Sequence, residues 1–394
     1  MPSLFRQPDF FRLWLVGLVA SVVRWLETLA VGVFVYQTTP SAFLVAMMTM
    51  LRLLPMGLFG ALLGAIAERV DRRIALIVVV LQLMLNSVVL AVLAFSGHVA
   101  LWHLAVASFL NGLGWATDNP VRRMMIGEVV GPELMGRAMS ADVVSNNASR
   151  MLGPVVGGLL LATVGLGVTF ALSALLYIFA VTAALRLTYR NPRIVAGSGA
   201  VFARMAEGFA CVRRSPKLIA TLMITIIYNL FGWPYTSMVP VIGLDNLHLG
   251  AAGIGVLASM EGIGALLGAV AMAMFGRPSH YVRVYVGGVF LSVVMLIIFA
   301  LVPNPIVAGA ALLLTGFGAA GFSIMQATLV YINAPAEMRG RVLGILSLCI
   351  GTGPIGFIGI GLAAEAFGAR AATVGTGLIG LAVLALTRRW WKAL

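Results

Sequence analysis

Charged residues are scarce in this protein. Asp, Glu, Lys and Arg make up 10% of its 394 residues, whereas soluble globular proteins contain about 25%. Apolar residues make up 61% of the chain, against about 45–50% in soluble domains. This composition excludes a soluble enzyme, a coiled coil and a disordered chain, and it predicts a membrane protein.

Residues and motifs that commonly carry enzyme chemistry are also scarce. The two cysteines, Cys211 and Cys349, are too few for a disulfide framework and match no metal-binding spacing. The four histidines are dispersed near predicted connections, and the sequence contains no nucleophile elbow, phosphate-binding loop or HExxH motif. We therefore predict neither an enzyme nor a bound metal or cofactor.

Long apolar segments are abundant instead. A helix needs about 20 apolar residues to cross the hydrocarbon of a bilayer. Twelve segments are of about this length, at 11–36, 43–67, 74–95, 99–121, 139–163, 168–188, 218–243, 251–275, 284–302, 306–332, 342–364 and 371–387. The sequence therefore predicts an all-α membrane protein. We expect an N-terminal six-helix bundle at 1–189, a cytoplasmic linker with a short amphipathic segment at 190–216, and a C-terminal six-helix bundle at 217–394.

Basic residues outnumber acidic residues by 26 to 13, which gives a net charge of +13. They cluster in alternate connections, such as 69–73 and 190–216. The opposite connections, such as 38–42 and 96–98, hold no Lys or Arg, with Arg370 as the exception. By the positive-inside rule, this alternation predicts that both termini are cytoplasmic. The surplus charge thus reports topology and attraction to anionic membrane lipid, and we predict no nucleic-acid partner.

An internal repeat relates the two halves of the sequence. The hexapeptide at 60–65 recurs identically at 264–269, an offset of 204 residues. Composition alone could explain this match, but the same offset also relates five further residues. It carries Gly112, Gly114, Glu133, Gly136 and Arg137 onto Gly316, Gly318, Glu337, Gly340 and Arg341. We therefore predict two bundles in the same orientation, related by a pseudo-twofold axis along the membrane normal, as in transporters with a site between their halves.

The stretch at 64–73, Gly-Ala-Ile-Ala-Glu-Arg-Val-Asp-Arg-Arg, resembles the cytoplasmic signature of the major facilitator superfamily, Gly-x-x-x-Asp-Arg-x-Gly-Arg-Arg. Glu68 stands in place of Asp and Asp71 in place of Gly. The second change is common in the branch that contains macrolide-efflux and enterobactin-exporter-like drug:proton antiporters. Three further stretches, at 118–122, 150–158 and 334–341, resemble sequences of the same branch. The resemblance implies a multi-pass transporter of a bacterial inner (plasma) membrane that moves a small molecule by alternating access and works as a monomer.

The signature supplies a candidate cytoplasmic gate, carried by Gly64, Glu68, Arg69, Asp71, Arg72 and Arg73. Glu68 can accept charge-assisted hydrogen bonds from Arg69, Arg72 or a neighbouring helix. It can also face the positive N-terminal end of a partner helix. The alternative is that the arginines only anchor the topology. Four further charged residues are candidates for an inter-helix network at the inner gate, with a purely structural role as the alternative: Asp118, Arg122, Asp142 and Arg150.

Four charged residues lie inside predicted membrane segments: Arg24, Glu27, Arg52 and Glu261. Charges at this depth are costly, so each is a candidate for binding substrate or protons. Their similar depth suggests a shared polar cavity between the halves. Glu27 beside Arg24 or Arg52 can exchange a proton for substrate, and a structural ion pair between Arg24 and Glu27 is the alternative. Glu261 has no evident partner within its own helix, which makes it the better candidate for a proton carrier.

The resemblance also implies that the first, fourth, seventh and tenth segments line the cavity. It nominates a set of polar and aromatic side chains there: Asn111, Trp115, Asn146, Asn147, Asn229, Trp233, Tyr235 and Gln326. Trp233-Pro234-Tyr235 is expected to break the backbone of the seventh segment and to contribute to an outer gate, because proline removes a helical hydrogen bond.

These observations predict a secondary active transporter that exports a small amphipathic or anionic molecule, drug-like or siderophore-like, in exchange for protons. Two alternatives stay open. In an importer or facilitator of a charged small molecule, Arg24 and Arg52 would hold an anionic group. A lipid flippase would instead need a cavity open sideways to the membrane.

Overall fold

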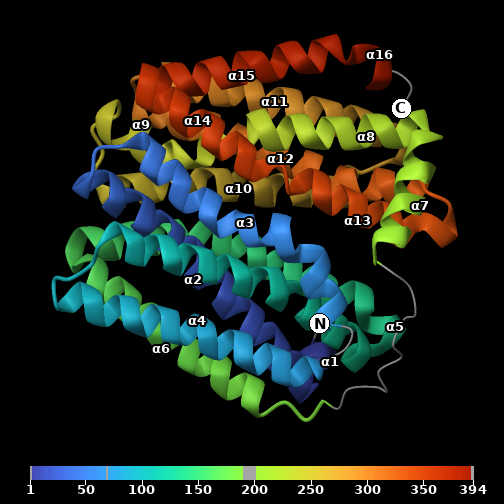
Figure 1. The fold of residues 1–394 in the computed structure, drawn as a ribbon, viewed down its shortest axis with the longest axis horizontal. Coiled ribbons are helices and arrows are strands. Elements are labelled where there is room, and N and C mark those ends of the chain that lie inside the picture. Colours follow the sequence, from blue (N-terminus) through green and yellow to red (C-terminus); the bar gives the residue numbers. More distant parts are fainter. Residues whose placement is uncertain (1, 68–69, 190–200, 392–394) are drawn as a thin grey trace. The chain divides into compact units, whose positions relative to one another are not determined.

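The structure is a computed structural model of the chain, and it describes residues 2–67, 70–189 and 201–391. These residues form helices and no strand (Figure 1). Ten helical stretches among them are long and apolar enough to cross a membrane. The prediction of an all-α membrane protein is therefore confirmed. The contacts divide the chain into two units, which we describe one at a time.

Unit 1 comprises Met1–Phe34, Leu51–Gly197 and Ala251–Val256. Its helices are α1 (Pro2–Phe5), α4 (Arg72–Phe95), α5 (Leu101–Thr163) and α6 (Gly165–Leu185), with most of α2 (Pro8–Thr38) and of α3 (Ala42–Ala67).

The stretch α5 joins two helices at Gly131, and it overlaps two of the predicted membrane segments, 99–121 and 139–163. The backbone of α5 turns at Gly131, where φ is 73° and ψ is 173°. A residue with a side chain is strained at this positive φ, so the glycine determines where the helix kinks.

The core of unit 1 forms where α4 packs against α5 and α6. Fully buried apolar side chains come from α2, α4 and α5, including Phe10, Leu76 and Met125. Large apolar side chains on α4 and α6, such as Val78 and Phe179, are exposed instead. An exposed apolar surface of this kind is stable against lipid tails and unstable against water, which fits a membrane-spanning bundle.

Unit 2 comprises Val35–Met50, Ser198–Gly250 and Leu257–Leu394. Its α-helices are α7 (Val201–Arg213), α8 (Pro216–Ile227), α9 (Val239–Asp245), most of α10 (Ala251–Phe275), α11 (Tyr281–Leu301), α12 (Pro305–Asn333), α13 (Arg339–Ile350), α14 (Gly353–Phe367), α15 (Ala369–Leu386) and α16 (Arg388–Trp391). Helix α11 packs against α12 and α15. Tyr285 fixes α11 to α8, because its hydroxyl donates to the Thr221 carbonyl at 2.7 Å.

The predicted segment at 218–243 is not one continuous α-helix. After α8 the chain makes a π-helical turn at Tyr228–Gly232 and a 3-10 turn at Pro234–Ser237, and then continues as α9. The expected break at Trp233-Pro234-Tyr235 is therefore present. A backbone that leaves the α-helical pattern at this depth is tolerated where it is buried in protein.

The amphipathic segment in the predicted linker forms α7, which packs against α13 (Figure 1). Val212 of α7 belongs to a buried cluster with Leu218 of α8 and Ile345 of α13. Glu207 pairs with Arg341 at 2.5 Å. Part of the apolar face of α7 is therefore covered by protein.

Two glycines of the internal repeat have the same structural role, each within its own unit. In unit 1, a side chain at Gly112 of α5 would collide with the backbone of Arg52 on α3. In unit 2, a side chain at Gly316 of α12 would collide with the backbone of Glu261 on α10. Small residues at these positions let neighbouring helices approach closely in a membrane.

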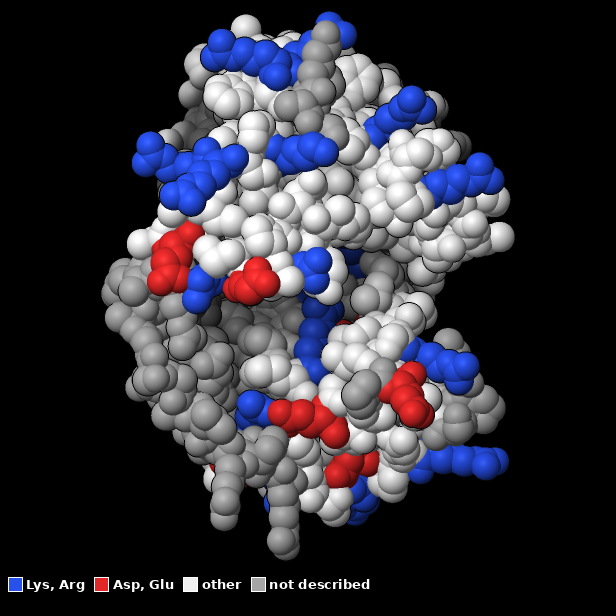
Figure 2. All heavy atoms as spheres, turned by 90° about the vertical axis from the view of Figure 1, so that its right-hand side faces the viewer, with Lys and Arg blue, Asp and Glu red and all other residues white. Residues whose placement is uncertain are grey.

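In unit 2, Lys and Arg side chains gather on the face shown in Figure 2. In Figure 1 this is the end that carries α7, α16 and the C-terminus of the chain. Connections predicted to be cytoplasmic supply such charges, including Arg213, Lys217 and Arg388.

Candidate functional site

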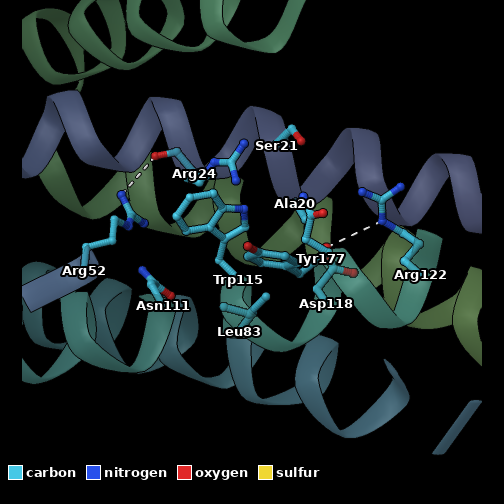
Figure 3. Close-up of a pocket in the computed structure, with 11 residues that line it drawn as sticks. Ala20, Ser21, Arg24, Arg52, Leu83, Asn111, Trp115, Asp118, Arg122 and Tyr177 are labelled. Carbon is cyan, nitrogen blue, oxygen red and sulfur yellow. Dashed lines mark hydrogen bonds and ion pairs between the residues drawn. The ribbon is translucent and has the colours of Figure 1, made fainter. Parts of the chain in front are cut away.

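A polar pocket lies inside unit 1, between side chains of α2, α3, α4, α5 and α6 (Figure 3). The empty space between them, including the part open to the surroundings, is about 390 Å³. Its polar and aromatic lining consists of Ser21, Arg24, Arg52, Asn111, Trp115, Asp118, Asn119, Arg122 and Tyr177. It is lined by two residues predicted for substrate or proton binding, Arg24 and Arg52, and by two predicted to line a cavity, Asn111 and Trp115.

Glu27 lies beside this pocket and is 2% exposed. Its carboxylate accepts hydrogen bonds from Ser87 Oγ at 2.8 Å and from Asn111 Nδ2 at 2.9 Å. Arg52 Nη2 lies 3.7 Å from the carboxylate and forms an ion pair with it. Ser173 of α6 is a further hydrogen-bond partner, so the charge of Glu27 is stabilised by one cation and by neutral donors that include Ser87 and Asn111.

Arg52 is held in place by the backbone of α2 as well as by Glu27. Its Nη1 donates to the carbonyl of Arg24 at 3.0 Å and to the hydroxyl of Thr28. The arginine therefore connects α3 to α2 next to the buried carboxylate. The sequence left open an ion pair between Arg24 and Glu27, but the structure pairs Glu27 with Arg52 instead.

Arg24 interacts with an amide and with aromatic rings. Its Nη2 donates to Asn146 Oδ1 at 2.6 Å. The carbon of its guanidinium lies 4.8 Å from the centre of the Trp115 ring, a cation–π distance. Asn147, the neighbour of Asn146 on α5, is half-buried.

A second buried charge cluster follows along α5. Arg122 is 3% exposed and pairs with Asp142 Oδ1 at 2.5 Å and with Asp118 Oδ2 at 3.5 Å (Figure 3). Asp142 also accepts from Arg123 Nε at 3.0 Å. The chain makes room for Arg122 at Gly17, where any side chain would collide with the guanidinium. Three of the four residues predicted for an inner-gate network are thus in contact.

Arg150, the fourth of these residues, lies elsewhere. Its guanidinium carbon is 5.2 Å from the centre of the Trp25 ring on α2. Gly153, one turn further along α5, lets Trp25 approach this closely, because a side chain there would collide with it. Arg150 therefore stacks between α5 and α2, two turns beyond Asp142.

The cytoplasmic signature is only partly described. Glu68 and Arg69 lie outside the described residues, and Gly64 lies in the last turns of α3. Asp71 caps α4, because its side chain accepts from the backbone N–H groups of Arg73 at 2.9 Å and Ile74 at 3.2 Å. This capping role also explains why an aspartate is accommodated at the position where the superfamily signature has glycine.

The two arginines of the signature contact other helices of unit 1. Arg72 pairs with Glu128 of α5, and Tyr189 donates its hydroxyl to the same carboxylate. Arg73 Nη2 donates to the carbonyl of Leu185 at 2.8 Å. Burial and the hydrogen bond to Glu128 raise the pKa of Tyr189 to about 12, so this hydroxyl keeps its proton at neutral pH.

The remaining candidates belong to unit 2 and are described by themselves. Asn229 is 3% exposed and donates to the carbonyl of Thr225 at 2.8 Å. This hydrogen bond gives the Thr225 carbonyl a donor near the point where α8 ends and the π-helical turn begins. Trp233 packs edge-on against Phe357, with ring centres 5.8 Å apart. Of the other candidates in unit 2, Tyr235 and Glu261 are buried and Gln326 is half-buried.

The sequence did not nominate several residues that contact the candidates. Asn86 and Ser87 were detectable as a pair of polar residues inside the apolar segment 74–95, and Tyr177 as the polar aromatic of the segment 168–188. Glu128 and Tyr189 had no such signal, because they lie among other polar residues near predicted connections. Among the described residues, no group of three or more His, Cys, Asp or Glu could hold a metal ion.

Comparison with known families now identifies the chain. A family model described as a transmembrane secretion effector matches residues 2–391. The chain belongs to this family. It is a transporter of the major facilitator superfamily, as the signature at 64–73 predicted, and it is not an enzyme.

Bacterial efflux and siderophore transporters are among the relatives that this chain resembles. Macrolide efflux protein A of Streptococcus pyogenes is 23% identical over 367 residues, which cover 91% of this chain and 90% of that protein. The staphyloferrin A transporter of Staphylococcus aureus is 22% identical over 349 residues, which cover 88% of this chain and 87% of that protein.

A solved structure has the same fold as this secretion effector. It is the inward-facing, unoccupied bacterial homologue of the human lysosomal transporter Spinster, with a TM-score of 0.73 at 16% identity. The match covers 99% of this chain and 97% of that one. The superfamily fold and a multi-pass membrane location are therefore established.

Proposed function

We propose that this protein exports a small amphipathic or anionic molecule in exchange for protons. The observation that carries the proposal is Glu27, a carboxylate buried inside unit 1 between Arg52 and neutral donors that include Ser87 and Asn111. A carboxylate at membrane depth is costly and commonly marks a proton or substrate pathway. The names of the relatives support export of a drug-like or siderophore-like cargo.

The proposed coupling follows from the pairing of Glu27 with Arg52. When Glu27 binds a proton it loses its negative charge, and its attraction for Arg52 falls to that of a neutral hydrogen bond. Arg52 is bonded to the Arg24 carbonyl and the Thr28 hydroxyl at the same time. Protonation therefore changes the balance of forces between α2 and α3 at the wall of the polar pocket.

We further propose that the chain works by alternating access, as a monomer, with both termini in the cytoplasm. The arrangement into bundles at 1–189 and 217–394, joined by a linker at 190–216, belongs to the same proposal. The basic connections and the repeat of 204 residues support it. In this arrangement the contacts of Arg72 and Arg73, with the Asp118–Arg122–Asp142 cluster, stabilise the cytoplasmic ends of the helices.

The test is transport in proteoliposomes with an imposed pH gradient, with a macrolide and staphyloferrin A as probes. We expect at least one probe to move against the proton flow and to stop when an uncoupler removes the gradient. Movement in the same direction as the protons would instead show an importer. Transport at a rate that does not depend on the pH gradient would show a facilitator.

Matched variants assign the proton site. Glu27→Gln should abolish the dependence of transport on the gradient, and Glu261→Gln tests the other buried carboxylate. The double variant Glu27→Gln, Arg52→Met restores the charge balance of the pocket without restoring an ionisable group at Glu27. If the double variant regains coupled transport, Glu27 only neutralises Arg52 and is not the proton carrier.

A further inference from the structure

The arginines of the unit 1 pocket differ in how their charges are balanced. Arg52 pairs with Glu27, and Arg122 pairs with both Asp118 and Asp142. Within the part of the chain that the structure describes, Arg24 makes no ion pair with a carboxylate. Arg123 supplies a second cation to Asp142, so the cluster around Arg122 is balanced as well. Arg24 therefore adds one positive charge to this pocket beyond the paired ones, and it interacts with Asp118 only through the longer-range electrostatic attraction.

Four buried polar atoms of the pocket lining have no hydrogen-bond partner among the described residues: Asp118 Oδ1 and the N–H groups Arg24 Nε, Trp115 Nε1 and Arg122 Nε. Arg122 Nε lies 3.5 Å from Asp118 Oδ2 and pairs with it as an ion, which leaves the N–H groups of Arg24 and Trp115. The guanidinium and the indole lie side by side, with the guanidinium carbon 4.8 Å from the centre of the ring (Figure 3). A buried donor without an acceptor destabilises the protein by about 1–3 kcal/mol, so two of them at one pocket indicate a position for a ligand.

The ligand chemistry follows from this combination. A group with one negative charge would compensate Arg24, and two oxygen acceptors would satisfy the two N–H groups. A carboxylate has both properties. A neutral amide offers a single carbonyl acceptor and no charge, and a cation would be repelled by Arg24.

We propose that Arg24 and Trp115 form a subsite for one carboxylate of the transported molecule. This inference rests on the proposed transport function and names the part of the substrate that unit 1 recognises. Asn146 holds the guanidinium through its 2.6 Å hydrogen bond. Glu27 stays paired with Arg52, which leaves Arg24 free to bind the substrate.

Equilibrium binding to the purified full-length protein tests this subsite. The protein is placed in nanodiscs of neutral phosphatidylcholine, and bound radiolabelled benzoate is measured without any pH gradient. Unlabelled benzoate should displace the label, whereas benzamide, which has the same ring and no charge, should not. Binding by wild type that benzamide displaces equally well would overturn the proposal.

Variants separate the subsite from the general positive charge of the protein. Arg24→Met should weaken benzoate binding at least tenfold, as expected for the loss of a charge-assisted hydrogen bond of about 1.5–3 kcal/mol. Arg24→Lys should retain part of the binding, and Trp115→Phe should weaken it severalfold while keeping the ring. Arg137→Met, at an exposed position of α5, removes the same charge and should bind benzoate as wild type does.

Two further results distinguish the possible failures. If Arg24→Met, with an unchanged thermal unfolding midpoint, binds benzoate as wild type does, the subsite does not exist. If glycerol 3-phosphate binds with the same dependence on Arg24 while benzoate does not bind, the site recognises a phosphate of lipid type, and the carboxylate assignment is wrong. Because no gradient is used, absence of proton-coupled transport in proteoliposomes would refute the proposed function and leave the binding result standing.

Discussion

Arg122→Met should strongly destabilise unit 1, because it leaves two carboxylates buried without their arginine. Arg122 is 3% exposed and lies 2.5 Å from Asp142 and 3.5 Å from Asp118. Removing one partner of a buried ion pair costs about 3–5 kcal/mol, since the remaining charge is no longer compensated. Asp142 keeps Arg123 at 3.0 Å, whereas Asp118 loses the arginine with which it pairs.

Arg123→Met is the matched control, because the two arginines are adjacent and share Asp142. The side chain of Arg123 is 43% exposed, and an exposed ion pair contributes about 0–1 kcal/mol. Unfolding of unit 1 can be followed in detergent by amide hydrogen exchange of α4 and α5 across a denaturant series, measured by mass spectrometry. The midpoint for Arg122→Met should fall well below that for Arg123→Met, and Asp118→Asn should recover part of the loss when it is added to Arg122→Met. Equal midpoints for the two arginine variants would refute this account of the cluster.

Three further substitutions test other contacts. Gly17→Ala places a Cβ against the guanidinium of Arg122, so it should cost about 1–3 kcal/mol by overpacking. The cost should be much smaller in the Arg122→Met background, and both costs are measured by the same exchange assay. Tyr189→Phe should cost about 1 kcal/mol through the lost hydrogen bond. Because the pKa of Tyr189 is raised to about 12, this difference should be constant below the unfolded pKa of about 10 and disappear as the pH rises through the folded value. Glu365→Ala removes the acceptor of Ser41 Oγ and of a backbone N–H at the start of α3, so amide exchange at 41–44 should accelerate about fivefold by mass spectrometry, as expected for about 1 kcal/mol. Unchanged exchange would show that the carboxylate does not hold this turn.

The helices could be predicted from the sequence because a bilayer imposes a minimum apolar length. The same criterion could not show where the helices that contain 99–121 and 139–163 meet. Whether the charged stretch between them stays helical depends on local backbone geometry, and there the chain turns at Gly131. It also could not place α7, since an amphipathic face can be covered by lipid or by protein. Packing of Val212 against Ile345 is a tertiary contact without a sequence signal.

Charge at membrane depth was a sufficient signal to nominate Arg24, Glu27 and Arg52, but not to predict their partners. Arg24 and Glu27 are three residues apart, and that spacing places side chains near one face of a helix. A side chain from a neighbouring helix can compete for either of them, and its position depends on how closely the helices approach. Gly112 sets that approach by letting the backbone of Arg52 come close to α5. The pairing of Glu27 with Arg52 is thus a result of packing, which the spacing within one helix does not encode.

The different partners of the three pocket arginines indicate different roles. An arginine that is paired at membrane depth, such as Arg52 or Arg122, can fix the positions of helices, because its desolvation is offset by carboxylates of the same unit. Arg24 contacts the amide of Asn146 and the ring of Trp115, and these groups offset the desolvation of a cation less completely than a carboxylate does. A structural role alone would be better served by a neutral side chain of similar size. The retained charge of Arg24 is therefore best explained by an anionic ligand that compensates it only when the pocket is occupied.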